Sequence, residues 1–369
     1  MKFIVMISTL LVVILGANFY VFFRLWHLIP QFPASKIILV SVAVAMVILP
    51  FITMGFGNHF PLPVASVMYR VGTSWIIIML YLVILFLALD LIRTTGVFQL
   101  DRFMFNSWTG LGVLTFICVV WMAAGNINYH HKKRVELNLK TNKNRTHDKP
   151  LKIVAIADLH LGYGIGTEEF RDWVKLINKE EPDVVLIAGD AIDNSLKPLY
   201  EKNFADIFRE IKTTHGIFMV PGNHEYISNI TKSIDFLIHA GVTVLKDSVA
   251  IVDQSYYIVG RDDRANSNRK SVSELTAALD PSKPIILLDH QPYHFDEVEN
   301  NHIDLFIAGH THDGQVAPIS LITKAMYEVS HGYLKKGDTH FYVTSGIGIW
   351  GGKFRIGSRS EYVVINLMP

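Results

Sequence analysis

The sequence is short of cysteine, of net charge and, over its first third, of charged residues of either sign. Cys118 is its one cysteine among 369 residues, which excludes an intramolecular disulfide and a cysteine-based zinc site. The net charge is +1, from 34 basic and 33 acidic residues. Because nucleic-acid binding requires a strongly basic surface, nucleic acid is not an expected partner.

Charge is scarcest at the start of the chain. Residues 1–125 contain eight of the 67 charged residues, too few for an ordinary soluble domain. Four stretches in this part contain no charge at all, namely residues 3–23, 37–56, 71–89 and 108–125. Each is close to the ~20 residues that cross a bilayer as a helix. We therefore expect residues 1–129 to form a transmembrane region of four helices, with the lipid bilayer as a partner.

An even number of spans places both ends of the chain on one side of the membrane. Lys132, Lys133 and Arg134 follow the fourth stretch and favour the cytoplasm for that side. We expect a multi-pass protein of a bacterial cell membrane with its C-terminal domain in the cytoplasm. The polar, basic segment 130–150 is interpreted as a juxtamembrane linker, with an edge strand at residues 135–139 as the alternative.

A transporter is disfavoured by the scarcity of ionisable groups in the four stretches. Transporters carry such groups facing the interior of the helix bundle. Here Asp90, Arg93 and Arg102 are expected at the edges of the spans.

After residue 150 the pattern changes to short apolar runs that end abruptly in polar residues. These runs are rich in β-branched residues, as buried strands are, and comprise residues 152–157, 183–189, 216–222, 285–288 and 303–309. Helical stretches are expected at 167–179, 199–212 and 228–240. The alternation predicts an α/β fold. Further strands at 242–245, 250–252, 255–259, 340–344 and 361–367 predict a second, mixed sheet.

The five apolar runs end directly before side chains that ligate metals or carry protons. These are Asp158, His160, Asp190, Asn223, His224, His290, His310 and His312. In open α/β sheets the carboxyl ends of strands converge on one ligand-binding region. In Asp-x-His and His-x-His, extended backbone would place both side chains on the same side.

This donor set predicts two metal ions. A mixture of carboxylate, amide oxygen and imidazole suits Mn, Fe, Zn or Ni better than Ca or Mg. Seven donors are too many for one tetrahedral ion and suit two ions that share a bridging carboxylate. Such a pair can bind a phosphoryl oxygen and activate a bridging water.

The motifs in order resemble the signatures of the calcineurin-like metallophosphoesterases. They are Asp158-x-His160, Gly189-Asp190-x-x-Asp193, Gly222-Asn223-His224-Glu225, His290 and Gly309-His310-Thr311-His312. The resemblance covers residues 151–369. Gly314-Gln315 and residues 345–351 are similar to a membrane-associated bacterial branch, the YkuE-like proteins.

The resemblance implies a four-layer α/β/β/α sandwich with a two-metal site. Asp158, His160 and His312 would hold one ion, Asn223, His290 and His310 the other, and Asp190 would bridge them. His224 would be a non-ligand that protonates the leaving oxygen. Asp193 and Glu225 would orient these groups through hydrogen bonds. Mn²⁺ is the first expectation for both ions, with Fe, Zn or Ni as alternatives.

Two further features stand beside the motifs. Asp313 follows the last ligand, where a smaller or neutral residue is expected, and would alter the charge at the rim of the site. The run from Arg261 to Arg264 is interpreted as a solvated, self-paired loop, in preference to a contact for substrate phosphate.

Together these observations predict a membrane-anchored metallophosphoesterase. We expect it to hydrolyse a phosphodiester or pyrophosphate bond in a lipid-linked or envelope-related substrate, by attack of a metal-bridging hydroxide. The partner would be a phosphorylated small molecule or lipid. The alternative is a metal-binding membrane scaffold or sensor without activity, which the intact His224 and complete ligand set disfavour.

Overall fold

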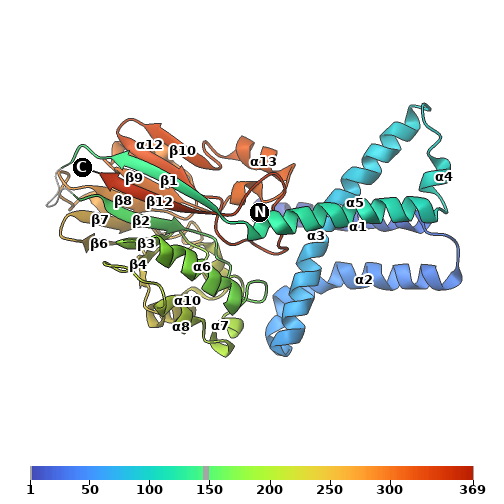
Figure 1. Ribbon diagram of the computed structural model, residues 1–369, viewed down its shortest axis with the longest axis horizontal. Helices are drawn as coiled ribbons and strands as arrows, with labels where there is room; N and C mark the ends of the chain where they lie inside the picture. The colour runs from blue at the N-terminus through green and yellow to red at the C-terminus, as the bar shows by residue number, and fades with distance from the viewer. Residues whose placement is uncertain (1, 144–148, 369) are drawn as a thin grey trace. The chain divides into compact units, whose positions relative to one another are not determined.

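The computed structural model describes residues 2–143 and 149–368, which divide into two compact units, residues 1–127 and 128–369 (Figure 1). The first unit consists of helices α1 (Lys2–Leu28), α2 (Pro33–Phe56), η1 (Gly57–His59), α3 (Leu62–Thr94), α4 (Asp101–Met104) and most of α5 (Trp108–His130). Among the described residues, four helices are long and apolar enough to cross a membrane: α1, α2, α3 and α5.

These helices extend beyond the uncharged stretches, because backbone hydrogen bonding continues through charged residues. Asp90 lies in α3 four residues before its last residue, Thr94, so it is near the edge of the span as expected from sequence. It forms an ion pair with Arg24 of α1 and accepts a hydrogen bond of 2.6 Å from Tyr20. The charge inside this helix is thus paired, as an apolar environment demands.

The surface of the first unit carries many large apolar side chains. Phe19, Leu91 and Ile37 are each about 70% exposed, on three different helices. Apolar patches of this extent are unfavourable in water and suit contact with lipid.

The second unit contains two six-stranded sheets. The first has the order β1-β12-β2-β3-β4-β5 and the second β10-β11-β9-β8-β7-β6. Their bounds are β1 (Lys133–Lys140), β2 (Leu151–Ile156), β3 (Val184–Ile187), β4 (Ile217–Met219), β5 (Thr243–Val244), β6 (Ser248–Val252), β7 (Tyr256–Gly260), β8 (Ile285–Leu288), β9 (Leu305–Ala308), β10 (Gly332–Lys336), β11 (Thr339–Val343) and β12 (Glu361–Met368). Neighbours β2, β3 and β4 run parallel, and so do β8 and β9.

The two sheets pack face to face with helices on their outer faces. Ile153 and Phe218 of the first sheet share one buried apolar cluster with Ile286 and Ile307 of the second. The helices of this unit are α6 (Thr167–Lys179), α7 (Lys197–Glu201), α8 (Phe204–Arg209), α9 (Asn223–Ile227), α10 (Ile230–His239), α11 (Val272–Thr276), α12 (Phe295–Asn300), η2 (His312–Gly314) and α13 (Ile319–Met326). The α/β/β/α sandwich is confirmed.

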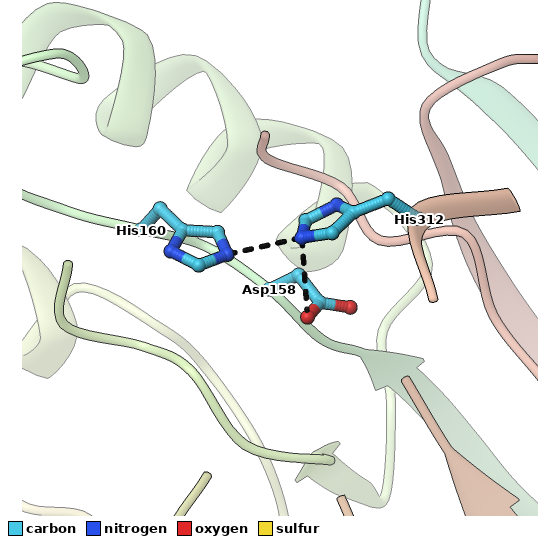
Figure 2. Close-up of side chains that lie close together, drawn as sticks. All are labelled: Asp158, His160 and His312. Atoms are coloured by element: carbon cyan, nitrogen blue, oxygen red, sulfur yellow. Dashed lines mark hydrogen bonds and ion pairs between the residues drawn. The ribbon is translucent and has the colours of Figure 1, made fainter. Parts of the chain in front are cut away.

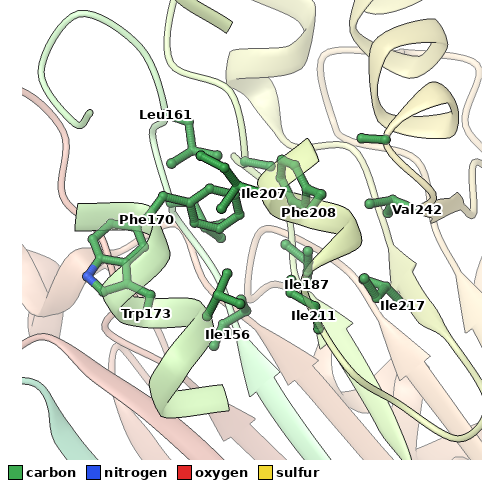
Figure 3. Close-up of a cluster of buried hydrophobic side chains, with 14 of the residues drawn as sticks. Ile156, Leu161, Phe170, Trp173, Ile187, Ile207, Phe208, Ile211, Ile217 and Val242 are labelled. Carbon is green, nitrogen blue, oxygen red and sulfur yellow. The ribbon is translucent and has the colours of Figure 1, made fainter. Parts of the chain in front are cut away.

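Helix α6 shows how the sequence builds the outer layer. Phe170, Trp173, Val174 and Ile177 recur at helical spacing and are all buried. They pack with residues of α8 and of the first sheet in a single cluster (Figure 3). One apolar face therefore fixes both the position and the rotation of α6.

Phe170→Ala is expected to lower the free energy of unfolding of the second unit by about 3–5 kcal/mol. The Phe170 ring is fully buried, with its centroid 4.7 Å from that of Phe208, so its removal leaves a cavity. Thermal unfolding followed by circular dichroism measures the effect. Arg171→Ala, on the exposed face of the same helix, is the control, and equal stabilities of the two variants would contradict this packing.

The interpretation of residues 130–150 as a linker is wrong for 133–140, which form β1, and the alternative of an edge strand at 135–139 is confirmed. This strand pairs in parallel with β12, and Val135 and Leu137 pack against the core between the sheets. Its alternation of polar and apolar residues fits an edge strand with one covered face. Residues 144–148 of the same segment lie outside the described residues.

Two other expectations need correction. The helix expected at 199–212 is divided into α7 and α8, because Asn203 between them has a positive φ of 52°. The strands expected at 242–245 and 361–367 correspond to β5 and β12, which belong to the first sheet and not to the second. Periodicity identifies a strand but not the sheet that it joins.

Candidate metal centre

All eight candidate side chains follow strands that end at one edge of the two sheets. The first cluster joins Asp158 and His160, after β2, to His312, after β9. Figure 2 shows the three side chains pointing toward one another. The two imidazole Nε2 atoms of this cluster are 3.2 Å apart, and Nε2 of His312 is 3.7 Å from Oδ1 of Asp158.

The second cluster is centred on His290, after β8. Its Nε2 atom lies 3.1 Å from Oδ2 of Asp190, 3.2 Å from Oδ1 of Asn223 and 3.2 Å from Nδ1 of His310. Four potential ligand atoms from four different segments thus surround one point.

Asp190 belongs to both clusters. Its Oδ2 atom is 3.1 Å from Nε2 of His290 in the second cluster and 3.9 Å from Nε2 of His160 in the first. Its Oδ1 atom accepts a hydrogen bond of 2.9 Å from the backbone N–H of His224, which fixes the carboxylate plane. A single carboxylate oxygen is therefore placed to serve two ions.

The hydrogen bonding of His290 fits a cation in the second cluster. Its Nδ1 donates to the backbone carbonyl of Ala188 at 2.8 Å, so in the neutral ring Nε2 carries a lone pair. That lone pair faces oxygen atoms of Asn223 and Asp190, which are acceptors as well. A positive ion among them satisfies all three.

The distances between nitrogen atoms fit metal ligation in the first cluster too. Two imidazole nitrogens bound to one tetrahedral ion at about 2.1 Å lie about 3.3 Å from each other. The Nε2 atoms of His160 and His312 lie 3.2 Å apart. The residues present therefore fit a pair of metal ions.

The backbone reaches this arrangement in an unexpected way. Extended backbone was the reason for expecting i and i+2 side chains on the same side, and that reason is wrong. Positive φ angles between 45° and 70° occur at Asp158, His160, Asp190, His310 and His312. The strands have ended before these residues, and left-handed turns aim the side chains at the site.

Two glycines of the motifs permit the close approach of these loops. A Cβ atom on Gly222 would lie 2.1 Å from Oδ1 of Asp190, and one on Gly189 would lie 2.4 Å from Nδ1 of His290. Gly189 also has a positive φ of 86°. A side chain at either position would push a candidate ligand out of place.

Comparison with known families agrees with this geometry. Residues 151–314 match the family model described as calcineurin-like phosphoesterase. This part of the chain is a calcineurin-like metallophosphoesterase domain. The narrower resemblance to the YkuE-like branch stays a prediction.

Curated relatives carry the same family name. An uncharacterized metallophosphoesterase of Helicobacter pylori strain J99 is 36% identical over 227 residues, which cover 60% of this chain and 61% of that one. A zebrafish (Danio rerio) transmembrane protein with metallophosphoesterase domain is 30% identical over 59% of this chain and 53% of its own. An uncharacterized metallophosphoesterase of Aquifex aeolicus is 27% identical over 68% and 98%, respectively. The chain thus spans about three fifths of the Helicobacter relative and about half of the zebrafish one.

Glu225 ties together two loops of the metallophosphoesterase domain. It is fully buried, and its carboxylate accepts hydrogen bonds from the backbone N–H groups of Gly222, Asp190 and Ile192 at 2.7, 3.1 and 2.9 Å. Burial and the nearby charge of Asp190 raise the pKa of Glu225 to about 7. Its place supports the orienting role expected from sequence.

His224 is largely buried, with 13% of its side chain exposed. Its Nδ1 donates to the backbone carbonyl of Asp193 at 2.9 Å and lies 3.4 Å from Oδ1 of the same residue. Burial lowers the pKa of His224, but the charges of Asp190 and Asp193 outweigh it and raise the pKa to about 9. His224 also lies within metal-ligand reach of His160 and Asp190.

Arg355 was not singled out from sequence, where an isolated arginine carries no signal. Its guanidinium is buried and donates to the backbone carbonyls of His312, Ser345 and Gly348 and to two serine hydroxyls. The planar guanidinium thereby fixes the loop that carries the candidate ligand His312. Arg355 is a positioning residue.

Arg355→Lys is expected to weaken metal binding at the first cluster by about 10–100-fold, because support of a ligand is lost while the charge remains. Isothermal titration of the metal-free protein with Mn²⁺ measures the affinity. Arg171→Lys, at an exposed position of α6, is the control. An unchanged Mn²⁺ affinity in Arg355→Lys would show that the Arg355 guanidinium does not keep His312 in position for metal binding.

The interpretation of the run from Arg261 to Arg264 as a solvated, self-paired loop is wrong for its first three residues, which are buried, whereas Arg264 is exposed. Asp262 and Asp263 are fully buried, and Arg261 donates to the carbonyl of Lys270 and to Glu297. The run therefore forms a buried network with neighbouring loops. Asp313, directly after His312, has 14% of its side chain exposed and lies 3.9 Å from His331, so it lies beside the site as expected.

Proposed function

We propose that this protein is a membrane-anchored phosphoesterase that uses two divalent metal ions, Mn²⁺ first among them. The observation that carries the proposal is the placement of Asp190 Oδ2 between two ligand clusters, 3.1 Å from His290 and 3.9 Å from His160. Of the functions that a mixed carboxylate and imidazole site supports, hydrolysis of a phosphoric ester makes use of two adjacent ions.

The ions, when bound, supply Lewis acidity toward a phosphoryl oxygen and lower the pKa of water. The chain's own residues supply the rest. His224, held through Nδ1 by Asp193, keeps its other ring nitrogen for a proton that it gives to the leaving oxygen. The Glu225 carboxylate accepts hydrogen bonds from the backbone N–H groups of Asp190 and Gly222. It thereby holds the loop of Asp190 against the loop of His224, so that these two side chains lie close together.

The proposed substrate is a lipid-linked or envelope-related phosphodiester or pyrophosphate. The metallophosphoesterase domain starts without a long spacer after α5, since Asn128 of that helix already contacts Arg355 and Ser358 of the domain. A domain attached so closely to membrane helices meets membrane-bound substrates at high effective concentration. The name of the zebrafish relative, transmembrane protein with metallophosphoesterase domain, describes the same combination and supports this proposal.

Hydrolysis of bis-p-nitrophenyl phosphate by the full-length chain in neutral detergent tests the activity. We expect Mn²⁺-dependent cleavage that a chelator abolishes and that His239→Ala, an exposed histidine of α10, retains. A folded chain that binds two ions but cleaves neither this diester, p-nitrophenyl phosphate nor a pyrophosphate would favour the scaffold interpretation.

The substrate class is tested with the same preparation. We expect higher kcat/KM for a lipid-linked pyrophosphate or phosphodiester in mixed micelles than for soluble nucleotides with the same bond. Equal turnover of both would contradict the lipid-linked proposal and leave the hydrolase proposal standing.

A further inference from the structure

A pocket of about 470 Å³ lies in the 128–369 unit and includes Asp313, which directly follows the candidate ligand His312. Its lining includes Asn128, from the last turn of α5, together with Lys133, Asp313, His331, Ser358, Arg359 and Glu361. None of these residues belongs to the proposed catalytic machinery.

The mouth of this pocket carries positive charge. Lys133 and Arg359 are exposed, and neither has an acidic partner among the residues that the structure describes. Of the two carboxylates in the lining, Glu361 lies 3.1 Å from Nε2 of His331, whereas Asp313 lies 3.9 Å from Nδ1 of the same ring and its Oδ1 atom has no hydrogen-bond partner among the described residues. The two cations are therefore available to an anion.

The backbone of the adjoining loop adds donors. The N–H groups of residues 357, 358 and 359 have no hydrogen-bond partner within the described ranges, and Gly357 has a positive φ of 80°. The side chain of Asn128 holds this loop by donating to the carbonyls of Arg355 and Ser358 at 2.8 Å each. Successive free N–H groups beside a left-handed residue form anion-binding concavities.

The position of Asn128 along α5 indicates the source of the anion. It follows the apolar run of residues 108–125 by three positions, which is the headgroup level for a helix that crosses the bilayer. Basic pockets at this level bind lipid phosphates. We propose that this pocket binds the phosphate of an anionic phospholipid headgroup, such as phosphatidylglycerol, an inference that rests on the proposed membrane anchoring.

Lipid retention by the full-length, metal-free protein in neutral detergent tests the proposal. Native mass spectrometry is used to compare phosphatidylglycerol with phosphatidylcholine of the same acyl chains. We expect Lys133→Gln or Arg359→Gln to weaken phosphatidylglycerol binding by about fivefold, and the double variant by about 25-fold. Lys140→Gln, an exposed lysine at the other end of β1, is the matched control with unchanged binding.

Three results would overturn the proposal: equal retention of both lipids, unchanged phosphatidylglycerol binding in the double variant, or displacement of the lipid by an equal concentration of glycerol phosphate or inorganic phosphate. The last would assign the pocket to a soluble phosphate. Because no hydrolysis is measured, failure here is distinguishable from failure of the phosphoesterase proposal. Both substituted side chains are exposed, and circular dichroism verifies the fold of each variant.

Discussion

Asp190→Asn is expected to lower kcat/KM by about 10³-fold or more and to release at least one of the two ions. The variant keeps an oxygen that can accept the hydrogen bond from the His224 N–H, but it loses the negative charge that lies 3.1 Å from His290 and 3.9 Å from His160. A neutral amide cannot hold two cations close together against their mutual repulsion.

Steady-state kinetics with saturating Mn²⁺ and metal analysis of the purified variant measure the two effects. Asp206→Asn, an exposed aspartate of α8, is the control that keeps both metals and activity. An Asp190→Asn variant with two ions and near-normal kcat would contradict the bridging position.

His224→Ala is expected to lower kcat by about 10²–10⁴-fold while both ions stay bound. Nδ1 of His224 is held by the carbonyl of Asp193. The ring lies within ligand reach of His160 and Asp190 but outside the cluster of His290 and His310. Loss of a metal ion in this variant would show instead that His224 is itself a ligand.

The pH profile separates proton donation from a structural role. The raised pKa of His224, about 9, means that the ring is protonated at neutral pH and loses its proton as the pH rises. Bound ions share the charge of Asp190 and lower this value, so the alkaline limb of kcat is expected at or below pH 9. In His224→Ala that limb disappears, whereas an unchanged limb would exclude His224 as the proton donor.

That the candidate ligands lie close together could be predicted from sequence, because it depends only on the order and direction of the strands. Runs such as 183–189 are too short and too apolar for anything but buried strands, and parallel strands bring Asp158 and Asp190 to one edge. The left-handed turns that follow could not be predicted, because Asp and His are enriched at positive φ among non-glycine residues but only a small share of them adopt it. Their roles as metal ligands stay predictions.

Other features depend on tertiary contacts that no local pattern records. Arg355 stabilises the His312 loop by donating hydrogen bonds to backbone carbonyl groups. The sequence around an isolated arginine does not show whether it makes such contacts. The charged run that begins at Arg261 is typical of a solvated loop, yet its first three residues are buried by loops from other parts of the chain. Strand β1 resembles a basic linker until β12, more than 200 residues later, pairs with it.

The number of Mn²⁺ ions bound per chain tests the central claim most directly. The full-length protein is stripped with a chelator, titrated with Mn²⁺ in detergent and analysed for metal content while hydrolysis of bis-p-nitrophenyl phosphate is followed in parallel. We predict two ions per chain, with activity rising only as the second ion binds. One ion or none in a folded and active protein would contradict a site built from two clusters around Asp190.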